Sequence, residues 1–187
     1  YASLDNRLIY EQTGVSTYQR IGVSYASLGK FEVAIEFLEK ALEIEYDDAV
    51  AFELATILYD QKEYQKANLY FKQIDTISQD FEGYEYGYAL SLHAEHQTEE
   101  ALRLTQQGLS KNPFDTRLLL LASQLSYELH DEQKAEDYLL KAKDNAEDLE
   151  EIALRLSNLY LEQERFDEVL KFEEQDIDNV LTKWNIA

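Results

Sequence analysis

Residues 15–47 read VSTYQRIGVSYASLGKFEVAIEFLEKALEIEYD, and the fold can be predicted from the pattern in this stretch. Its two halves are separated by Leu28-Gly29-Lys30, and a glycine between two periodic segments is typical of a turn between helices. Within each half, bulky and small residues recur three or four positions apart, which places them on one face of a helix. The stretch therefore predicts two packed helices. The residues that face each other are Tyr18, Ile21, Gly22 and Tyr25 in the first half, and Ala34, Leu38 and Ala41 in the second.

The same pattern recurs along the chain with a period close to 34 residues. The small residue of the second helix returns at steps of 33, 34, 34 and 34, and the small residue of the first helix keeps the same steps. Five units in register predict a repeat array in which these ladders form the core rather than a cofactor site. The ladders are Ala34, Ala67, Ala101, Ala135 and Val169 in the second helices, and Gly22, Ala55, Ala89, Ser123 and Ser157 in the first.

This pattern resembles the tetratricopeptide repeat, whose signature is W-x2-L-G-x2-Y in the first helix and A-x3-F-x2-A in the second. The resemblance implies an all-α, right-handed superhelix of about five helix-turn-helix repeats. The acidic, tyrosine-rich composition is also similar to that of multi-repeat proteins of Gram-positive bacteria. We expect one array over residues 1–187, with repeats at 15–47, 48–81, 82–115, 116–149 and 150–176.

Half-repeats are expected at both ends of the array. Residues 1–14 suit the second helix of a preceding partial repeat, and residues 177–187 suit the start of a further one. Such ends are typical of a fragment of a longer protein. Because end repeats without a polar cap leave an apolar face in water, we also expect a tendency to self-associate.

Charge and composition argue against several classes of partner. The 187 residues carry 17 basic and 38 acidic side chains, a net charge of -21, which repels nucleic acid and anionic membranes. No apolar run approaches the roughly 20 residues that span a bilayer. The chain has no cysteine, which suits a reducing compartment, so we expect a cytoplasmic protein.

No catalytic, cofactor or metal site is predicted. His93 and His96 would share a helical face with nearby glutamates, but His96 falls at a predicted turn, and such a mixture is ordinary in an acidic helix pair. The sequence contains no glycine-rich phosphate loop and no nucleophile elbow. We therefore expect a protein that is not an enzyme.

Binding is predicted on the first helices, which line the concave side of the superhelix in the family that the chain resembles. Exposed aromatic and leucine side chains supply contact area at low entropy cost, and arginine forks pair with carboxylates. The alternative is a tightly wound array in which these side chains pack against each other across the groove. The predicted site comprises Arg20, Phe52, Tyr59, Tyr86, Leu90, His93, Arg117, Gln124, Tyr127, Arg155 and Asn158.

The predicted function is that of a scaffold that binds a peptide or a partner helix in the concave groove. Two alternatives stay open at this point: the peptide-sensing regulatory domain of a transcription regulator, and an architectural spacer in a larger assembly. A subclass of the family grips chaperone tails through lysine, arginine and asparagine. Here Gln19, Val23, Glu53, Gly83 and Gly87 stand at those places, so chaperone-tail binding is not predicted.

The ladder of small residues makes a testable prediction about packing. Ala67→Leu should overfill the seam between two paired helices and lower the free energy of unfolding by about 1–3 kcal/mol. Gln65→Leu, two positions away on the polar face, should change it by less than about 0.5 kcal/mol. Urea unfolding followed by circular dichroism measures both values, and equal effects would contradict the predicted register.

Overall fold

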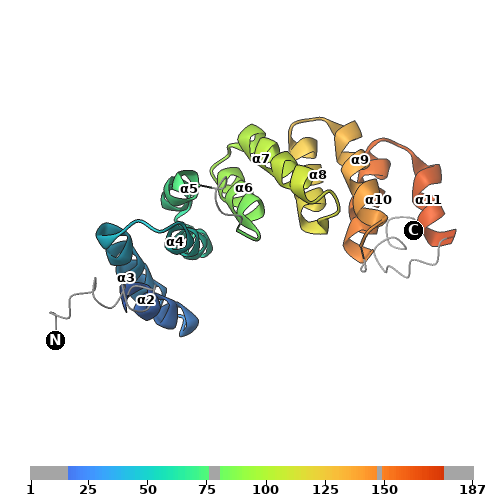
Figure 1. The fold of residues 1–187 in the computed structure, drawn as a ribbon. Helices are drawn as coiled ribbons and strands as arrows, with labels where there is room; N and C mark the ends of the chain where they lie inside the picture. The colour runs from blue at the N-terminus through green and yellow to red at the C-terminus, as the bar shows by residue number, and fades with distance from the viewer. Residues whose placement is uncertain (1–16, 76–80, 147–148, 175–187) are drawn as a thin grey trace. The chain divides into compact units, whose positions relative to one another are not determined.

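The computed structural model describes residues 17–75, 81–146 and 149–174, and every regular element among them is an α-helix (Figure 1). This confirms the predicted all-α class. The expected half-repeats at 1–14 and 177–187 lie outside the described residues. None of the described helices is long and apolar enough to cross a membrane. The helices within these described ranges are α2 (Thr17–Ser27), α3 (Phe31–Ile44), α4 (Asp48–Asp60), α5 (Tyr64–Gln73), α6 (Tyr84–Ala94), α7 (Thr98–Lys111), α8 (Thr116–Glu128), α9 (Glu132–Lys143), α10 (Glu150–Glu162) and α11 (Phe166–Glu174).

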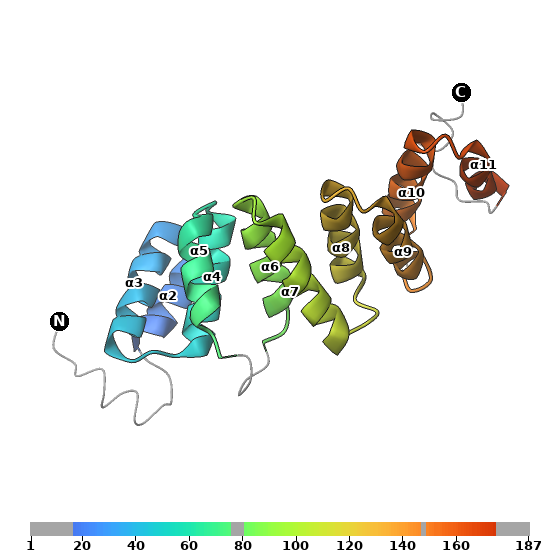
Figure 2. The same ribbon diagram turned by 90° about the horizontal axis from the view of Figure 1, so that it is seen from above.

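The chain forms two compact units, Tyr1–His96 and Gln97–Ala187. In the first unit, α2 packs on α3 and α4 packs on α5; in the second, α8 packs on α9 and α10 on α11 (Figures 1 and 2). Each of these pairs is joined by a turn of a few residues, so its two helices run antiparallel. The helix-turn-helix pairs predicted from the periodicity are therefore present within each unit.

Small residues lie where paired helices touch. Ala34 and Ala67 are completely buried, and the first-helix residue Ala55 is buried equally. At Gly22 the two helices of the first pair come so close that an added Cβ would lie 2.7 Å from Cγ of Leu38. The predicted ladders are therefore core, as the sequence pattern indicates.

Apolar side chains from four helices form the core of the second unit. Leu119 of α8, Leu139 of α9, Leu156 of α10 and Val169 of α11 belong to one buried cluster. Burying side chains of this size is worth about 1.5–3 kcal/mol each, so this cluster is a main source of the unit's stability.

A salt bridge between buried Glu136 and partly exposed Arg165 joins α9 to the turn before α11. Arg165 donates from Nη1 to Glu136 Oε2 over 2.6 Å and from Nη2 to Oε1 over 3.0 Å, while the Tyr160 hydroxyl donates to the same carboxylate over 3.1 Å. The Arg165 hydrogen bonds hold the pKa of Glu136 below its usual value. Burial, with the Glu136 charge, raises the pKa of Tyr160 to about 12. Glu136 therefore stays ionised and Tyr160 stays protonated at neutral pH.

The turn inside each pair uses a left-handed residue at one repeated position. Gly29 has φ 71° in the first pair, and Lys62, His96, His130 and Glu164 have φ between 57° and 64° at the corresponding places. In the pair formed by α8 and α9, the Asp131 N–H then donates back to the Ser126 carbonyl over 2.9 Å, which closes the end of α8. This arrangement is a Schellman motif, in which glycine is the preferred residue. Only the first turn has that glycine.

These turns predict a gain in stability from glycine. His130→Gly should raise the free energy of unfolding by about 0.5–1 kcal/mol, because an L-residue in the left-handed region is strained. Gln133→Gly, three residues later in helical backbone, should lower it by about 1 kcal/mol. Denaturant unfolding measures the difference, and a loss of stability in both variants would contradict the assigned turn.

Candidate functional site

A pocket of about 250 Å³ opens between α8 and α10 in the second unit. Side chains of α8 and α10 form its walls, and Ala135 and Leu139 of α9, both buried, form its floor. Four of the sequence-predicted residues meet here. The residues that line the pocket are Ser123, Gln124, Tyr127, Ala135, Leu139, Arg155, Asn158, Leu159 and Glu162.

Helical spacing brings the polar side chains of this pocket together. Gln124 and Tyr127 are three residues apart on α8, and Arg155 and Asn158 are three apart on α10, so each couple shares a helix face. Gln124 and Asn158 also occupy equivalent positions in successive helix pairs, one period apart in the sequence. The repeat therefore places two carboxamide side chains on opposite walls of one pocket.

A hydrogen bond joins the two walls across the pocket. The Tyr127 hydroxyl of α8 donates to Glu162 Oε2 of α10 over 2.5 Å. This hydrogen bond to a carboxylate raises the pKa of Tyr127, so the hydroxyl stays protonated. The residue as a whole remains 43% exposed. Tyr127 thus presents an accessible aromatic face while its polar end is fixed.

The two predicted arginines of this unit both have carboxylate partners on their own segment. Arg155 donates to Glu151 Oε1 from Nε over 3.0 Å and from Nη2 over 2.7 Å. Arg117 donates from Nη2 to Asp115 Oδ2 over 3.0 Å, and Asp115 also caps the N-terminus of α8. Arg155 lines the pocket, whereas Arg117 does not. A carboxylate ligand would have to compete with these intramolecular partners.

Phe52 of the first unit is part of a packed aromatic cluster. Its ring centroid lies 5.3 Å from that of Phe81 and 6.2 Å from that of Phe71. Tyr84 joins the cluster and donates its hydroxyl to the Phe71 carbonyl over 2.9 Å. Phe52 is therefore held between α4, α5 and the start of α6 and contributes to stability.

The other predicted residues of the first unit are more dispersed. Tyr59 packs on Tyr64 with ring centroids 5.6 Å apart, and burial, with the nearby Tyr64 and Tyr86, raises the pKa of Tyr59. Leu90 and His93 are half-buried on α6, as is Tyr86. Arg20 is exposed and lines a separate hollow over α2 and α3, together with Tyr25 and Phe37. Among the residues that the structure describes, no cluster of three or more His, Asp or Glu is placed to hold a metal ion.

Several residues that line the α8–α10 pocket are not part of the predicted site. Ala135 belongs to the predicted core ladder and is buried, yet it also lines the pocket. Leu139, four residues later on α9, is buried and lines the pocket as well. Leu159 and Glu162 lie one and four positions after Asn158 on the same helix. The i, i+4 rule could have identified Glu162, since it shares the face of Asn158.

Comparisons with known proteins identify the repeat and the fold. A family model for the tetratricopeptide repeat matches residues 15–48. No curated protein sequence matches the chain at a significant level. The crystal structure of MamA is similar with a TM-score of 0.77 at 15% identity, covering 81% of this chain and 90% of that one.

Two further solved structures share this architecture. MamA (residues 41 to the end) from Desulfovibrio magneticus RS-1 gives a TM-score of 0.72 at 18% identity, covering 86% of this chain and 96% of that one. YrrB, described as a TPR protein with an unusual peptide-binding site, gives 0.75 at 15% identity and covers 95% of each chain. At these identities the likeness shows the fold, a TPR solenoid.

The surroundings of Phe52 and Tyr127 predict opposite responses to truncation. Phe52→Ala should lower the free energy of unfolding by about 2–4 kcal/mol, because it leaves a cavity among packed rings. Tyr127→Ala should change it by less than about 1 kcal/mol, because the residue is 43% exposed and its hydrogen bond is at the surface. Chemical denaturation of the two variants tests this, and a larger loss for Tyr127→Ala would contradict the assigned environments.

Proposed function

We propose that this tetratricopeptide-repeat protein is a non-catalytic interaction module that binds a peptide or a partner helix over α8 and α10. The observation that carries the proposal is the α8–α10 pocket, where Gln124, Tyr127, Arg155 and Asn158 converge. These four side chains come from two first helices of successive pairs. A segment bound at this pocket could therefore contact both helices and continue along them.

The carboxamides of the pocket suit a polypeptide backbone. Each carboxamide offers two N–H donors and one carbonyl acceptor, the same groups that pair with the donors and acceptors of an extended segment. Gln124 is half-buried and gives one bond to Glu128 over 3.2 Å, which orients its amide without exhausting its hydrogen-bonding capacity. Asn158 stands on the opposite wall.

Tyr127 supplies the apolar contact area that such a segment needs. Tyrosine is enriched at the energetic centres of interfaces, since a large rigid ring loses little entropy on binding. The floor of Leu139 and the adjacent Leu159 continue this apolar surface into the pocket. A short partner segment that inserts one side chain into the pocket would contact both the Tyr127 ring and this apolar surface.

The chemistry of the pocket supports binding rather than catalysis. The Tyr127 hydroxyl has a raised pKa and donates to Glu162, so it is a poor nucleophile at neutral pH. The pocket lining contains no histidine, cysteine or lysine. YrrB, a protein of the same fold that is described as having an unusual peptide-binding site, lends further support.

Peptide selection tests the proposal. A displayed library of random peptides should yield binders to the full chain, and Tyr127→Ala should weaken their binding by about tenfold or more, as the loss of a central aromatic anchor does. Gln124→Ala should weaken it to a smaller degree, because one hydrogen-bonding side chain is lost. Fluorescence anisotropy with the selected peptides measures both effects.

The matched control is Gln107→Ala, which removes the same side chain from an exposed site on α7 of the same unit. It should leave affinity unchanged, and circular dichroism should show all three variants folded. Binders that tolerate Tyr127→Ala and Gln124→Ala as well as they tolerate Gln107→Ala would move the interface away from α8 and α10.

A further inference from the structure

We propose that the α8–α10 pocket accepts a lysine or arginine side chain of the bound segment. This inference rests on the proposed function and names the chemistry of the partner. It is carried by the charges, the floor and the size of the pocket.

The ionised groups of the pocket favour a cation. Arg155 and Glu162 are the two charged side chains among its lining residues. The Arg155 guanidinium is already bound by Glu151, which offsets its charge. Glu162 accepts only the neutral Tyr127 hydroxyl, and no cation of the described residues pairs with its carboxylate. An incoming positive charge would therefore meet an uncompensated carboxylate, and an incoming negative charge would be repelled by it.

The floor suits the aliphatic stem of a basic residue. Leu139 is 2% exposed and Leu159 is 4% exposed, and both line the pocket beneath its polar rim. Lysine and arginine bury their methylene groups against such surfaces while the charged end remains at the polar boundary. The order of groups from floor to rim, leucine and then carboxylate, matches the order along a lysine side chain.

The Tyr127 ring offers a further contact for a basic side chain. Its accessible face can take a cation–π contact, in which a positive charge lies over the ring. Its hydroxyl, fixed on Glu162 over 2.5 Å, holds the carboxylate beside the ring. One cation could therefore contact both the ring face and the carboxylate.

The volume of the pocket fits a side chain rather than a separate small molecule. At about 250 Å³ it is smaller than most ligand and cofactor sites, which measure roughly 300–1,000 Å³. It is open at the rim, so the rest of the segment could continue along α8 and α10. A side chain presented by a polypeptide fits these dimensions.

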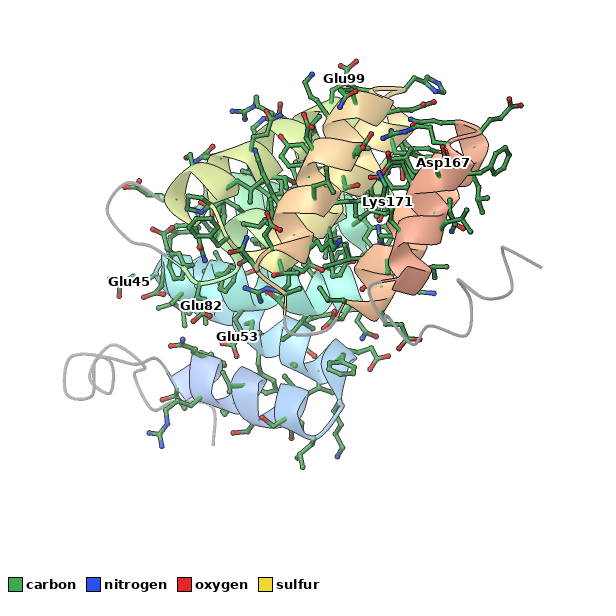
Figure 3. All side chains as sticks on the ribbon, turned by 90° about the vertical axis from the view of Figure 1, so that its right-hand side faces the viewer. Glu45, Glu53, Glu82, Glu99, Asp167 and Lys171 are labelled. Atoms are coloured by element: carbon green, nitrogen blue, oxygen red, sulfur yellow. The ribbon has the colours of Figure 1, made fainter. Side chains whose placement is uncertain are left out.

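The net charge of the chain would also attract a basic partner. The chain carries a net charge of -21, and in the second unit, which holds the pocket, acidic side chains such as Glu99 project from the helices (Figure 3). A field of this sign accelerates the encounter with a cationic segment and slows that with an acidic one. Because such a field also promotes unspecific attraction, the test must separate the pocket from the overall charge.

The experiment uses peptides selected from the random displayed library on the full chain. The selected peptides should be enriched in lysine or arginine at one position. Replacing that lysine by norleucine, which keeps the stem and removes the charge, should weaken binding by about tenfold. Glu162→Gln should weaken the parent peptide to a similar degree and the norleucine peptide hardly at all. Glu99→Gln makes the same charge change on α7 outside the pocket and should leave binding of both peptides nearly unchanged.

A charge exchange gives the sharpest readout. Glu162→Lys should reject the lysine peptide and accept the peptide in which glutamate replaces that lysine. Selected peptides without a preferred basic residue whose binding is still lost in Tyr127→Ala would overturn this inference and leave the proposed function standing. Equal losses in Glu162→Gln and Glu99→Gln would also overturn it, since unspecific charge would then explain the binding. Failure to select any peptide that depends on Tyr127 would count against the proposed function itself.

Discussion

The close contact between paired helices is the constraint on which the rest of this structure depends. Two helices can approach as closely as α2 and α3 only if the residue at their crossing is very small, and a Cβ on Gly22 would lie 3.2 Å from the Ala34 carbonyl oxygen and closer still to Leu38. Alanine or serine fills the same position in the later pairs and is buried there. Tight pairing lets short helices, each marginal alone, bury a shared core within each unit.

The equivalent close contact between α8 and α9 shapes the candidate site. Ser123 and Ala135 are members of the two ladders of small residues, and both line the α8–α10 pocket. Because α8 and α9 approach closely there, the buried side chain of Leu139 lies directly beneath the exposed groups of the pocket rather than behind another layer. Core residues of the repeat thus serve as the floor of the recognition surface, and the residues one helical turn away supply its polar walls.

Much of this arrangement could be predicted from the sequence, because burial of small residues at fixed steps leaves a direct trace in the amino acids. The left-handed conformation of the later turn residues could not be predicted. Glycine indicates it in the first turn, but Lys62, His130 and Glu164 stand at the corresponding places in later turns. The place of Phe52 could not be predicted either. Its ring packs on Phe81, which precedes α6 and lies outside any ladder. Periodicity places a side chain on a helix face, but the neighbouring rings decide whether that face is covered.

The central claim is that ligands contact the α8–α10 pocket, and the methyl groups of two adjacent leucines test it most directly. Leu139 is buried in the pocket floor, whereas Leu140 is 40% exposed and does not line the pocket. In a methyl-labelled NMR titration with a selected peptide, we expect saturable shifts of the Leu139 and Leu159 methyl signals, whereas the Leu140 methyl signals should not shift. Shifts confined to Leu140, with Leu139 and Leu159 unmoved at saturation, would contradict it.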